Sequence, residues 1–83
     1  MDADIGMLRW RCRRGMKELD LLLTGYVDNE YRDAAPDQRQ AFWRLLECHD
    51  PLIYDYLLGR VPPPDAVLSA LIERIAASRS NDR

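Results

Sequence analysis

Residues 8–23 read LRWRCRRGMKELDLLL, and this stretch marks the junction between the first two elements of the chain. Four arginines fall within six positions, Gly15 follows them, and a leucine-rich run begins at Leu19. Glycine adopts a positive φ without steric cost and commonly ends a helix in the left-handed conformation. The stretch therefore predicts a helix before Gly15, a turn at the glycine and a second helix after it.

Apolar residues recur at helical spacing along nearly the whole chain, and no stretch shows the alternation of a β-strand. Pro36 and Pro51 suit the first turns of helices, Asp50 is expected to cap the helix that follows it, and Gly59 to end that helix. The spacing predicts five helices: residues 4–13, residues 16–32, a third that starts at Pro36, a fourth from Asp50 to Gly59, and residues 64–78. His49 is expected to be the last residue on the inner face of the third helix.

Five short amphipathic helices with short links predict an all-α protein, a compact five-helix bundle in a single domain over residues 1–83. The core is expected over about residues 4–78, and residues 79–83 form a polar C-terminal tail. One face of the first helix carries Ile5, Leu8 and Cys12, while Trp10 lies nearly opposite, with Arg14 one turn beyond it. The other residues expected to point inward are Met16, Leu19, Leu22, Leu23, Tyr26, Val27, Phe42, Leu45, Leu46, Leu52, Ile53, Tyr56, Leu57, Val67, Leu68, Leu71, Ile72 and Ile75.

Charge is unevenly distributed along the 83 residues, although the net charge is only −2. Five of the twelve basic residues lie between Arg9 and Lys17, and ten of the fourteen acidic residues follow Asp20. A short helix with arginines around it offers little to a nucleic acid, and the acidic remainder would repel phosphate, so nucleic acid is not an expected partner. The N-terminus is no signal peptide and no apolar run approaches a membrane span, so we expect a soluble cytoplasmic protein without direct membrane insertion.

Reactive residue types are few, and their spacing supports no catalytic, cofactor-binding or metal site. Cys12, Cys48 and His49 lack metal-ligand spacing, and His49 with Asp50 is better explained by packing and capping. The serines and Thr24 lack a His–acid partner set, and there is no glycine-rich phosphate loop or dinucleotide-binding signature. Cys12 lies near arginines that would lower a thiol pKa, but its apolar face favours burial. We therefore expect no enzyme and no stably bound cofactor.

The arginine cluster is open to two interpretations. It can be a solvated helix end, where cations are favoured by the helix dipole, and Gly15 can be a simple helix stop. Alternatively, Arg14 before the glycine and Glu18 after it form a small docking patch of both signs, which a partner backbone approaches closely at Gly15. Trp10 would add an aromatic anchor, since tryptophan is enriched at interaction hot spots.

The stretch RGMKE matches the RGxxE motif of the succinate dehydrogenase assembly factor family, also called the flavinator family. The string W-x-C-R-R-G-M-x-E-L-D fits the family signature as well, and the resemblance continues through FWRLLECHDPLIYDYLLG to PPPDAVLSALIERI, over roughly residues 7–76. Two departures are visible, because the family often has an acidic residue where Leu52 stands and a tryptophan where Tyr56 stands. Neither departure touches the RGxxE residues.

The resemblance implies a five-helix bundle that is not itself an enzyme and acts in the bacterial cytoplasm. It also implies binding to the flavoprotein subunit of succinate dehydrogenase, and in bacteria of fumarate reductase, with promotion of covalent FAD attachment to a histidine of that subunit. FAD is then the cofactor of the client. Carried over by position, the primary contacts are Arg14, Gly15 and Glu18, and the secondary contacts are Trp10, Arg13, Asp20 and Asp50.

A second functional class stays open at this point. Small helical proteins also serve as regulatory or antitoxin-like protein-binding modules, and the residues alone do not separate this class from an assembly factor. The identity of a protein captured from cell extract would separate them.

Overall fold

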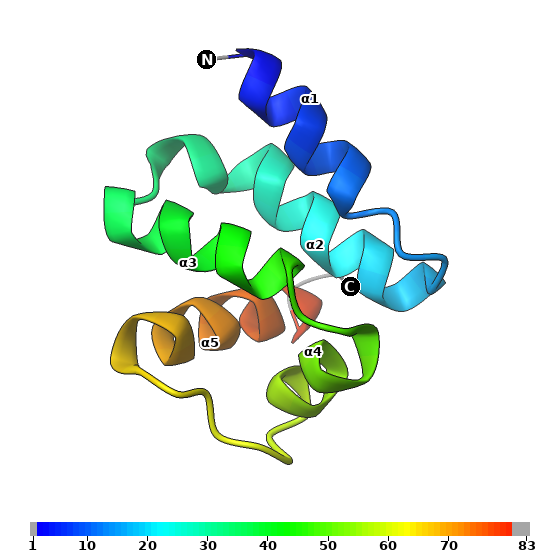
Figure 1. Cartoon of the computed structure of the whole chain (residues 1–83), viewed down its shortest axis with the longest axis vertical. Helices are drawn as coiled ribbons and strands as arrows, with labels where there is room; N and C mark the ends of the chain where they lie inside the picture. Colours follow the sequence, from blue (N-terminus) through cyan, green and yellow to red (C-terminus); the bar gives the residue numbers. More distant parts are fainter. Residues whose placement is uncertain (1, 81–83) are drawn as a thin grey trace.

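The computed structural model describes the backbone of residues 2–80 and the side chains of residues 5–77, and within this part the chain forms five α-helices and no strand (Figure 1). A short 3-10 helix, η1, follows the second helix. The predicted all-α fold of five helices is confirmed. The elements are α1 (Asp2–Arg11), α2 (Lys17–Asn29), η1 (Tyr31–Asp33), α3 (Pro36–Leu46), α4 (Asp50–Leu57) and α5 (Ala66–Ser80).

Helix α5 organises the bundle, because it contacts α2, α3 and α4. Helix α1 packs on α2 and lies at the end of the molecule opposite α4 and α5 (Figure 1). The loop between α1 and α2 lies beside the turn that joins α3 to α4, because Arg14 in the loop donates to the carbonyls of Leu46 and Cys48. Among the described residues, no helix combines the length and the apolar character that crossing a membrane requires.

One apolar core joins all five helices. Phe42 is fully buried at its centre, with its ring 4.8 Å from that of Tyr26 and 6.0 Å from that of Tyr31, which are distances typical of stabilising aromatic pairs. Periodicity predicted most of this core correctly, although some of the predicted inward residues are only partly buried: Ile5, Met16, Leu52, Tyr56, Leu57 and Val67. The buried set comprises Leu8, Cys12, Leu19, Leu22, Leu23, Tyr26, Val27, Tyr31, Ala41, Phe42, Leu45, Leu46, Ile53, Leu68, Leu71, Ile72 and Ile75.

Two helix ends differ from the predicted ones in a way that matters for the site. Helix α1 ends at Arg11, so Arg14 lies in the following loop and not on the helix face that Trp10 occupies. Helix α3 ends at Leu46, and His49 has an extended backbone with φ −71° and ψ 149°. His49 is therefore exposed at the N-cap position of α4, and its predicted place on the inner face of the third helix is wrong.

The helix starts depend on different caps from those expected. Asp50 forms no side-chain cap on α4, so that prediction is wrong, whereas Pro36 does lie in the first turn of α3 and Gly59 ends α4 with φ +76°. Helix α5 begins at Ala66, two residues later than expected, because Asp65 caps it: Oδ1 accepts a hydrogen bond of 2.8 Å from the N–H of Leu68.

Helix α1 begins at Asp2, two residues before its predicted start, and two further differences lie at the C-terminal ends of helices. The second helix, expected to reach residue 32, ends at Asn29, because Glu30 leaves the helical conformation with φ −132° before η1 begins. Helix α5 extends to Ser80, so only residues 81–83 of the expected polar tail fall after it, and these lie outside the described residues.

The cap at Asp65 predicts a pH-dependent contribution to stability. Hydrogen bonds from Arg44 and from the N–H of Leu68 hold the pKa of Asp65 below its usual 3.8, so this stabilisation is present above pH 3.8 and is lost as the pH falls through the lowered pKa. Replacing Asp65→Ala should lower the melting temperature at neutral pH by several degrees, and the difference should shrink at about pH 2. Circular dichroism during heating measures both values.

Asp65→Asn is the matched control, because asparagine keeps the capping oxygen and removes the charge. Its melting temperature at neutral pH should fall between those of the wild type and Asp65→Ala. An equal loss for Asp65→Ala at both pH values would contradict a role for the carboxylate.

Candidate functional site

The Gly15 loop, residues 12–16, connects α1 to α2 and carries the glycine of the RGxxE motif. Gly15 has φ +84°, a conformation that side chains other than glycine rarely adopt. A Cβ atom built at this position meets no heavy atom within 4 Å, and the residue is exposed. The glycine is therefore required by the backbone of the loop, while the space in front of it is open.

Arg14 turns back into the molecule and binds the ends of other helices. Its Nε donates to Oδ1 of Asp50 at 2.8 Å and its Nη2 to the carbonyl of Cys48 at 2.6 Å. Its Nη1 donates to the carbonyl of Leu46 at 2.8 Å and to that of Arg11 at 3.1 Å. The side chain is only 15% exposed. Carbonyls at helix C-termini lack partners within the helix and attract cations, so Arg14 caps α1 and α3.

Asp20 fixes the loop from the other side. It lies in the first turn of α2, and its two carboxylate oxygens accept the backbone N–H groups of Arg14 at 2.8 Å and of Gly15 at 3.3 Å. Asp50, which begins α4, supplies the counter-charge to the guanidinium. We call Arg14, Asp20 and Asp50 the frame, because their contacts within the chain hold the Gly15 loop in place.

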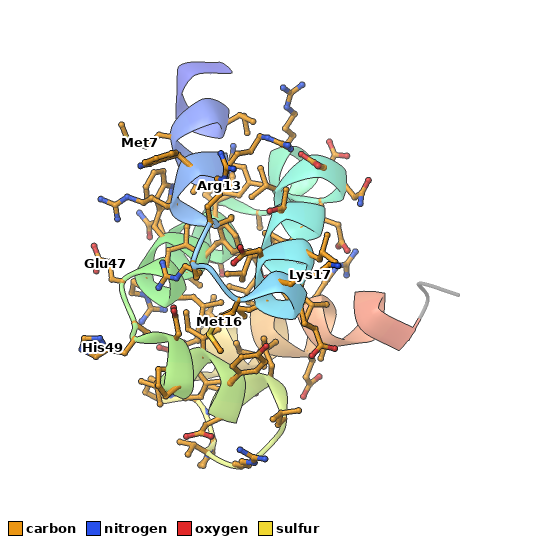
Figure 2. All side chains as sticks on the ribbon, turned by 90° about the vertical axis from the view of Figure 1, so that its right-hand side faces the viewer. Met7, Arg13, Met16, Lys17, Glu47 and His49 are labelled. Carbon is orange, nitrogen blue, oxygen red and sulfur yellow. The ribbon has the colours of Figure 1, made fainter. Side chains whose placement is uncertain are left out.

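The other four predicted contact residues are exposed, and we name them the docking face after the role predicted for them. Gly15 and Glu18 are exposed on the loop and on the first turn of α2, Arg13 is exposed on the loop, and Trp10 is 70% exposed on α1. Figure 2 shows Arg13 at the start of the loop, with Lys17 following on α2. The structure therefore divides the seven predicted residues into a frame that faces inward and a docking face that faces outward.

Cys12 is the first residue of this loop and is fully buried, as its position on the apolar face of the first predicted helix indicated. Burial raises the pKa of its thiol to about 11, although Arg14 and Arg9 act in the opposite direction. The sulfur is thus a neutral thiol near pH 7. Burial also raises the pKa of Cys48, and both cysteines are free of disulfides. Within residues 5–77, no three His, Cys, Asp or Glu side chains come together as a metal site would require.

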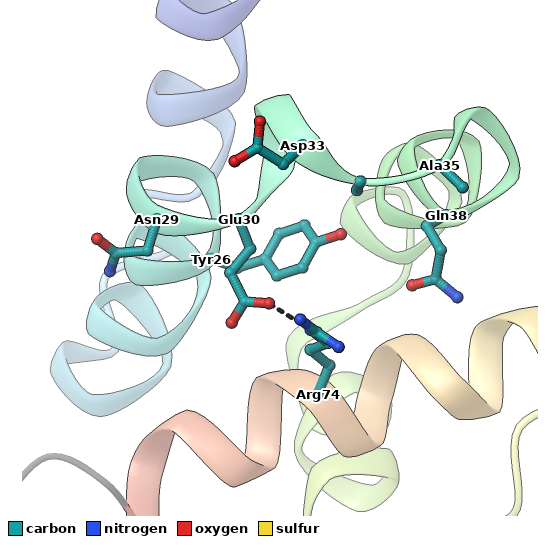
Figure 3. Close-up of a pocket in the computed structure, with 8 residues that line it drawn as sticks. Tyr26, Asn29, Glu30, Asp33, Ala35, Gln38 and Arg74 are labelled. Carbon is teal, nitrogen blue, oxygen red and sulfur yellow. Dashed lines mark hydrogen bonds and ion pairs between the residues drawn. The ribbon is translucent and has the colours of Figure 1, made fainter.

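A pocket of about 310 Å³ lies at the other end of α2 (Figure 3). Two of its lining residues, Glu30 and Arg74, form an ion pair, and none of the predicted contact residues lines it. The thirteen residues of α2, at 1.5 Å per residue, place this pocket about 20 Å from the Gly15 loop. Its lining residues are Tyr26, Asn29, Glu30, Asp33, Ala34, Ala35, Gln38 and Arg74.

The residues of the Gly15 loop are recognisable in the sequence, but the contacts that several of them make within the chain are not. The acceptors of Arg14 on the α3–α4 turn lie 32 to 36 positions away, and no local pattern announces such a contact. For Asp20 a signal existed, because an aspartate in the first turn of a helix commonly accepts backbone N–H groups. The pocket near Arg74 left no readable pattern in the sequence.

Comparison with known proteins gives a consistent result. The model of the family described as "Flavinator of succinate dehydrogenase" matches residues 6–79, which include the whole Gly15 loop. The chain is 40% identical to a protein of Shewanella oneidensis over 87% of this chain and 88% of that protein. It is 41% identical to one of Coxiella burnetii (82% and 83%) and 44% identical to one of Methylococcus capsulatus (87% and 87%). All three relatives carry the name FAD assembly factor SdhE.

The frame predicts that Arg14 is important for stability. Arg14→Ala removes four hydrogen bonds and leaves Asp50 and three carbonyls without their donor, which should cost about 2 to 3 kcal/mol in the free energy of unfolding. Urea denaturation followed by circular dichroism measures the loss. Arg14→Lys should recover only part of it, since a lysine ammonium cannot reproduce the planar fork.

Arg13→Ala provides the matched control, because Arg13 is the neighbouring arginine but is exposed. Its free energy of unfolding should stay within about 0.5 kcal/mol of the wild type. Equal effects of the two substitutions would show that Arg14 does not hold the loop.

Proposed function

Because the chain belongs to the family of flavinators of succinate dehydrogenase, we propose that it binds the flavoprotein subunit of that enzyme and promotes the covalent attachment of FAD. The observation that carries the proposal is the Gly15 loop, in which the glycine of the RGxxE motif is exposed and held in place by the frame. We include the flavoprotein subunit of fumarate reductase as a second client.

The proposed role is positioning, not bond chemistry. The guanidinium of Arg14 is engaged within the chain, and the thiol of Cys12 is buried and protonated near pH 7. The reacting groups, a histidine and the flavin, then both belong to the client, and this chain holds no FAD stably. Holding two reacting groups in the correct geometry contributes up to about 7 to 11 kcal/mol to a reaction. A small bundle that stabilises one arrangement of the client can supply part of this effect.

The frame and the docking face divide the work in this proposal. The frame fixes the path of the loop, so that Gly15 presents bare backbone to the client and Glu18 is exposed beside it. A partner backbone can approach a glycine more closely than any other residue. Arg14, Asp20 and Asp50 then act as positioning residues, and Gly15, Glu18, Trp10 and Arg13 make the contacts.

Glu18→Ala tests the contact role directly. The purified variant should stay folded, because Glu18 is exposed, and at limiting concentration it should flavinylate the client at least tenfold more slowly. The assay incubates purified apo-flavoprotein with FAD and reads covalent flavin as gel fluorescence in the client band.

Glu73→Ala is the control, since Glu73 is an exposed acid on α5 and takes no part in the Gly15 loop. It should leave the flavinylation rate unchanged. A normal rate for Glu18→Ala would remove Glu18 from the contact surface. No gain in fluorescence on adding the wild-type protein would refute the proposed function itself.

Gly15 permits a comparison that separates folding from docking. Gly15→Ala and Gly15→Arg both place a Cβ at φ +84°, so both should lose about 1 to 2 kcal/mol of stability. Only arginine fills the open space in front of the loop. We expect Gly15→Ala to bind the apo-flavoprotein within a few-fold of the wild type and Gly15→Arg to lose binding, as measured by isothermal titration calorimetry.

Circular dichroism of both Gly15 variants confirms that each is folded at the assay temperature. If Gly15→Ala loses binding as completely as Gly15→Arg, the glycine serves the backbone conformation and close approach is not its function.

A further inference from the structure

Charge pairing is uneven over the surface. Most arginines outside the Gly15 loop are bound to carboxylates of this chain, whereas Arg11, Arg13 and Lys17 form no ion pair with any residue in the described part. These three cations lie within seven positions of one another, immediately around Gly15. The paired arginines are Arg9 with Asp28, Arg44 with Asp65, Arg60 with Asp55 and Arg74 with Glu30. Arg39 on α3 is a fourth cation without an ion pair in the described part, and its guanidinium lies over the Tyr31 ring. Three of these four cations therefore lie around Gly15.

The same region carries the most exposed apolar side chains of α1. Met7 is 57% exposed and Trp10 is 70% exposed, and their spacing of three residues places them on one face of the helix. The backbone N–H of Arg13 donates to the carbonyl of Trp10 at 3.1 Å, so the backbone of Arg13 lies about one turn beyond Trp10. Figure 2 shows Met7 on the outer side of α1 and Arg13 where the helix gives way to the loop.

Arg11 is held in position on this surface. Its guanidinium carbon lies 5.6 Å from the centre of the Trp43 ring on α3, within the range of a cation–π contact. Trp43 is itself fixed, because its indole N–H donates to the hydroxyl of Tyr31 at 3.0 Å. A cation stacked on an aromatic ring keeps its charge and its outer N–H groups available for an anionic partner.

We propose that Met7, Trp10, Arg11 and Arg13, which we call the α1 patch, bind an acidic segment on the surface of the client flavoprotein. An apolar side chain of that segment covers Trp10, and its carboxylates face Arg11 and Arg13. This inference rests on the proposed function and adds the chemistry of the partner surface. Charge complementarity identifies the occupant as anionic, and the exposed tryptophan and methionine favour a protein over a nucleic acid.

The test measures affinity for purified apo-flavoprotein by isothermal titration calorimetry at about 50 mM and about 300 mM NaCl. Trp10→Ala should weaken binding at least tenfold at both salt concentrations, because burial of an aromatic anchor is not screened by salt. Arg13→Ala should weaken binding several-fold at low salt and should reduce the salt dependence of the dissociation constant, because it removes one charge of the complementary pair.

Two controls match these variants. Leu58→Ala removes an apolar side chain that is 45% exposed at the end of α4, and Arg60→Ala removes an exposed arginine that is paired with Asp55. Both should bind within twofold of the wild type with unchanged salt dependence. Circular dichroism should show wild-type helicity for all four variants, since each altered side chain is exposed.

The outcomes separate this inference from the proposed function. If Trp10→Ala and Arg13→Ala bind within twofold of the wild type while Gly15→Arg does not, the α1 patch is not part of the interface. Trp10 and Arg13 then leave the proposed contact set, and the proposed binding and flavinylation of the client stand. Unchanged salt dependence for Arg13→Ala overturns the acidic partner segment. Two results together would assign the patch to another ligand and overturn the inference. The first is that the wild-type protein binds DNA or anionic vesicles through Trp10. The second is that Trp10→Ala leaves the affinity for the flavoprotein unchanged. A wild-type chain that does not bind the flavoprotein refutes the proposed function.

Discussion

The guanidinium of Arg14 joins parts of the chain that are remote in sequence. It binds the carbonyl that ends α3, the carbonyl of Cys48 in the next turn and the carboxylate that begins α4, all 32 to 36 positions away. A mostly buried cation is unfavourable unless several acceptors surround it, so the position of each of these segments limits that of the others. A domain of 83 residues buries only a modest share of its surface, and one polar connection of this kind is important in it.

The same connection explains how a mobile type of element, a glycine loop, can present a defined surface. Asp20 accepts the backbone N–H groups of Arg14 and Gly15, and Asp50 accepts a hydrogen bond from the Arg14 side chain. Carboxylates therefore fix both the backbone and the side chain of the motif arginine. The space that a Cβ of residue 15 would enter is open, while the backbone N–H of Gly15 is held by Asp20. The motif thus combines two physically different parts, since its arginine faces inward and its glycine and glutamate face outward.

The sequence predicted what depends on local spacing and missed what depends on distant partners. The apolar stripes of α2 and α5 were correct because a helical period of 3.6 residues places Leu19, Leu23, Leu71 and Ile75 on buried faces whatever the packing partner is. The end of α1 at Arg11, and with it the inward turn of Arg14, depends on acceptors in α3 and α4. The prediction for His49 was wrong for a related reason. The apolar spacing of α3 continues past Leu46 in the sequence, but the helical backbone ends at Leu46 and His49 is extended.

The division between frame and docking face also changes how substitutions in the motif have to be interpreted. Loss of activity on replacing Arg14 reports first on the connection between α1, α3 and α4, since its hydrogen bonds lie within the chain. Loss on replacing Glu18 reports on the outer surface, because that residue is exposed on α2. Gly15 belongs to both parts, through its positive φ and through the open space in front of it. A motif of three fixed residues therefore contains one structural position, one surface position and one position at which the two requirements meet.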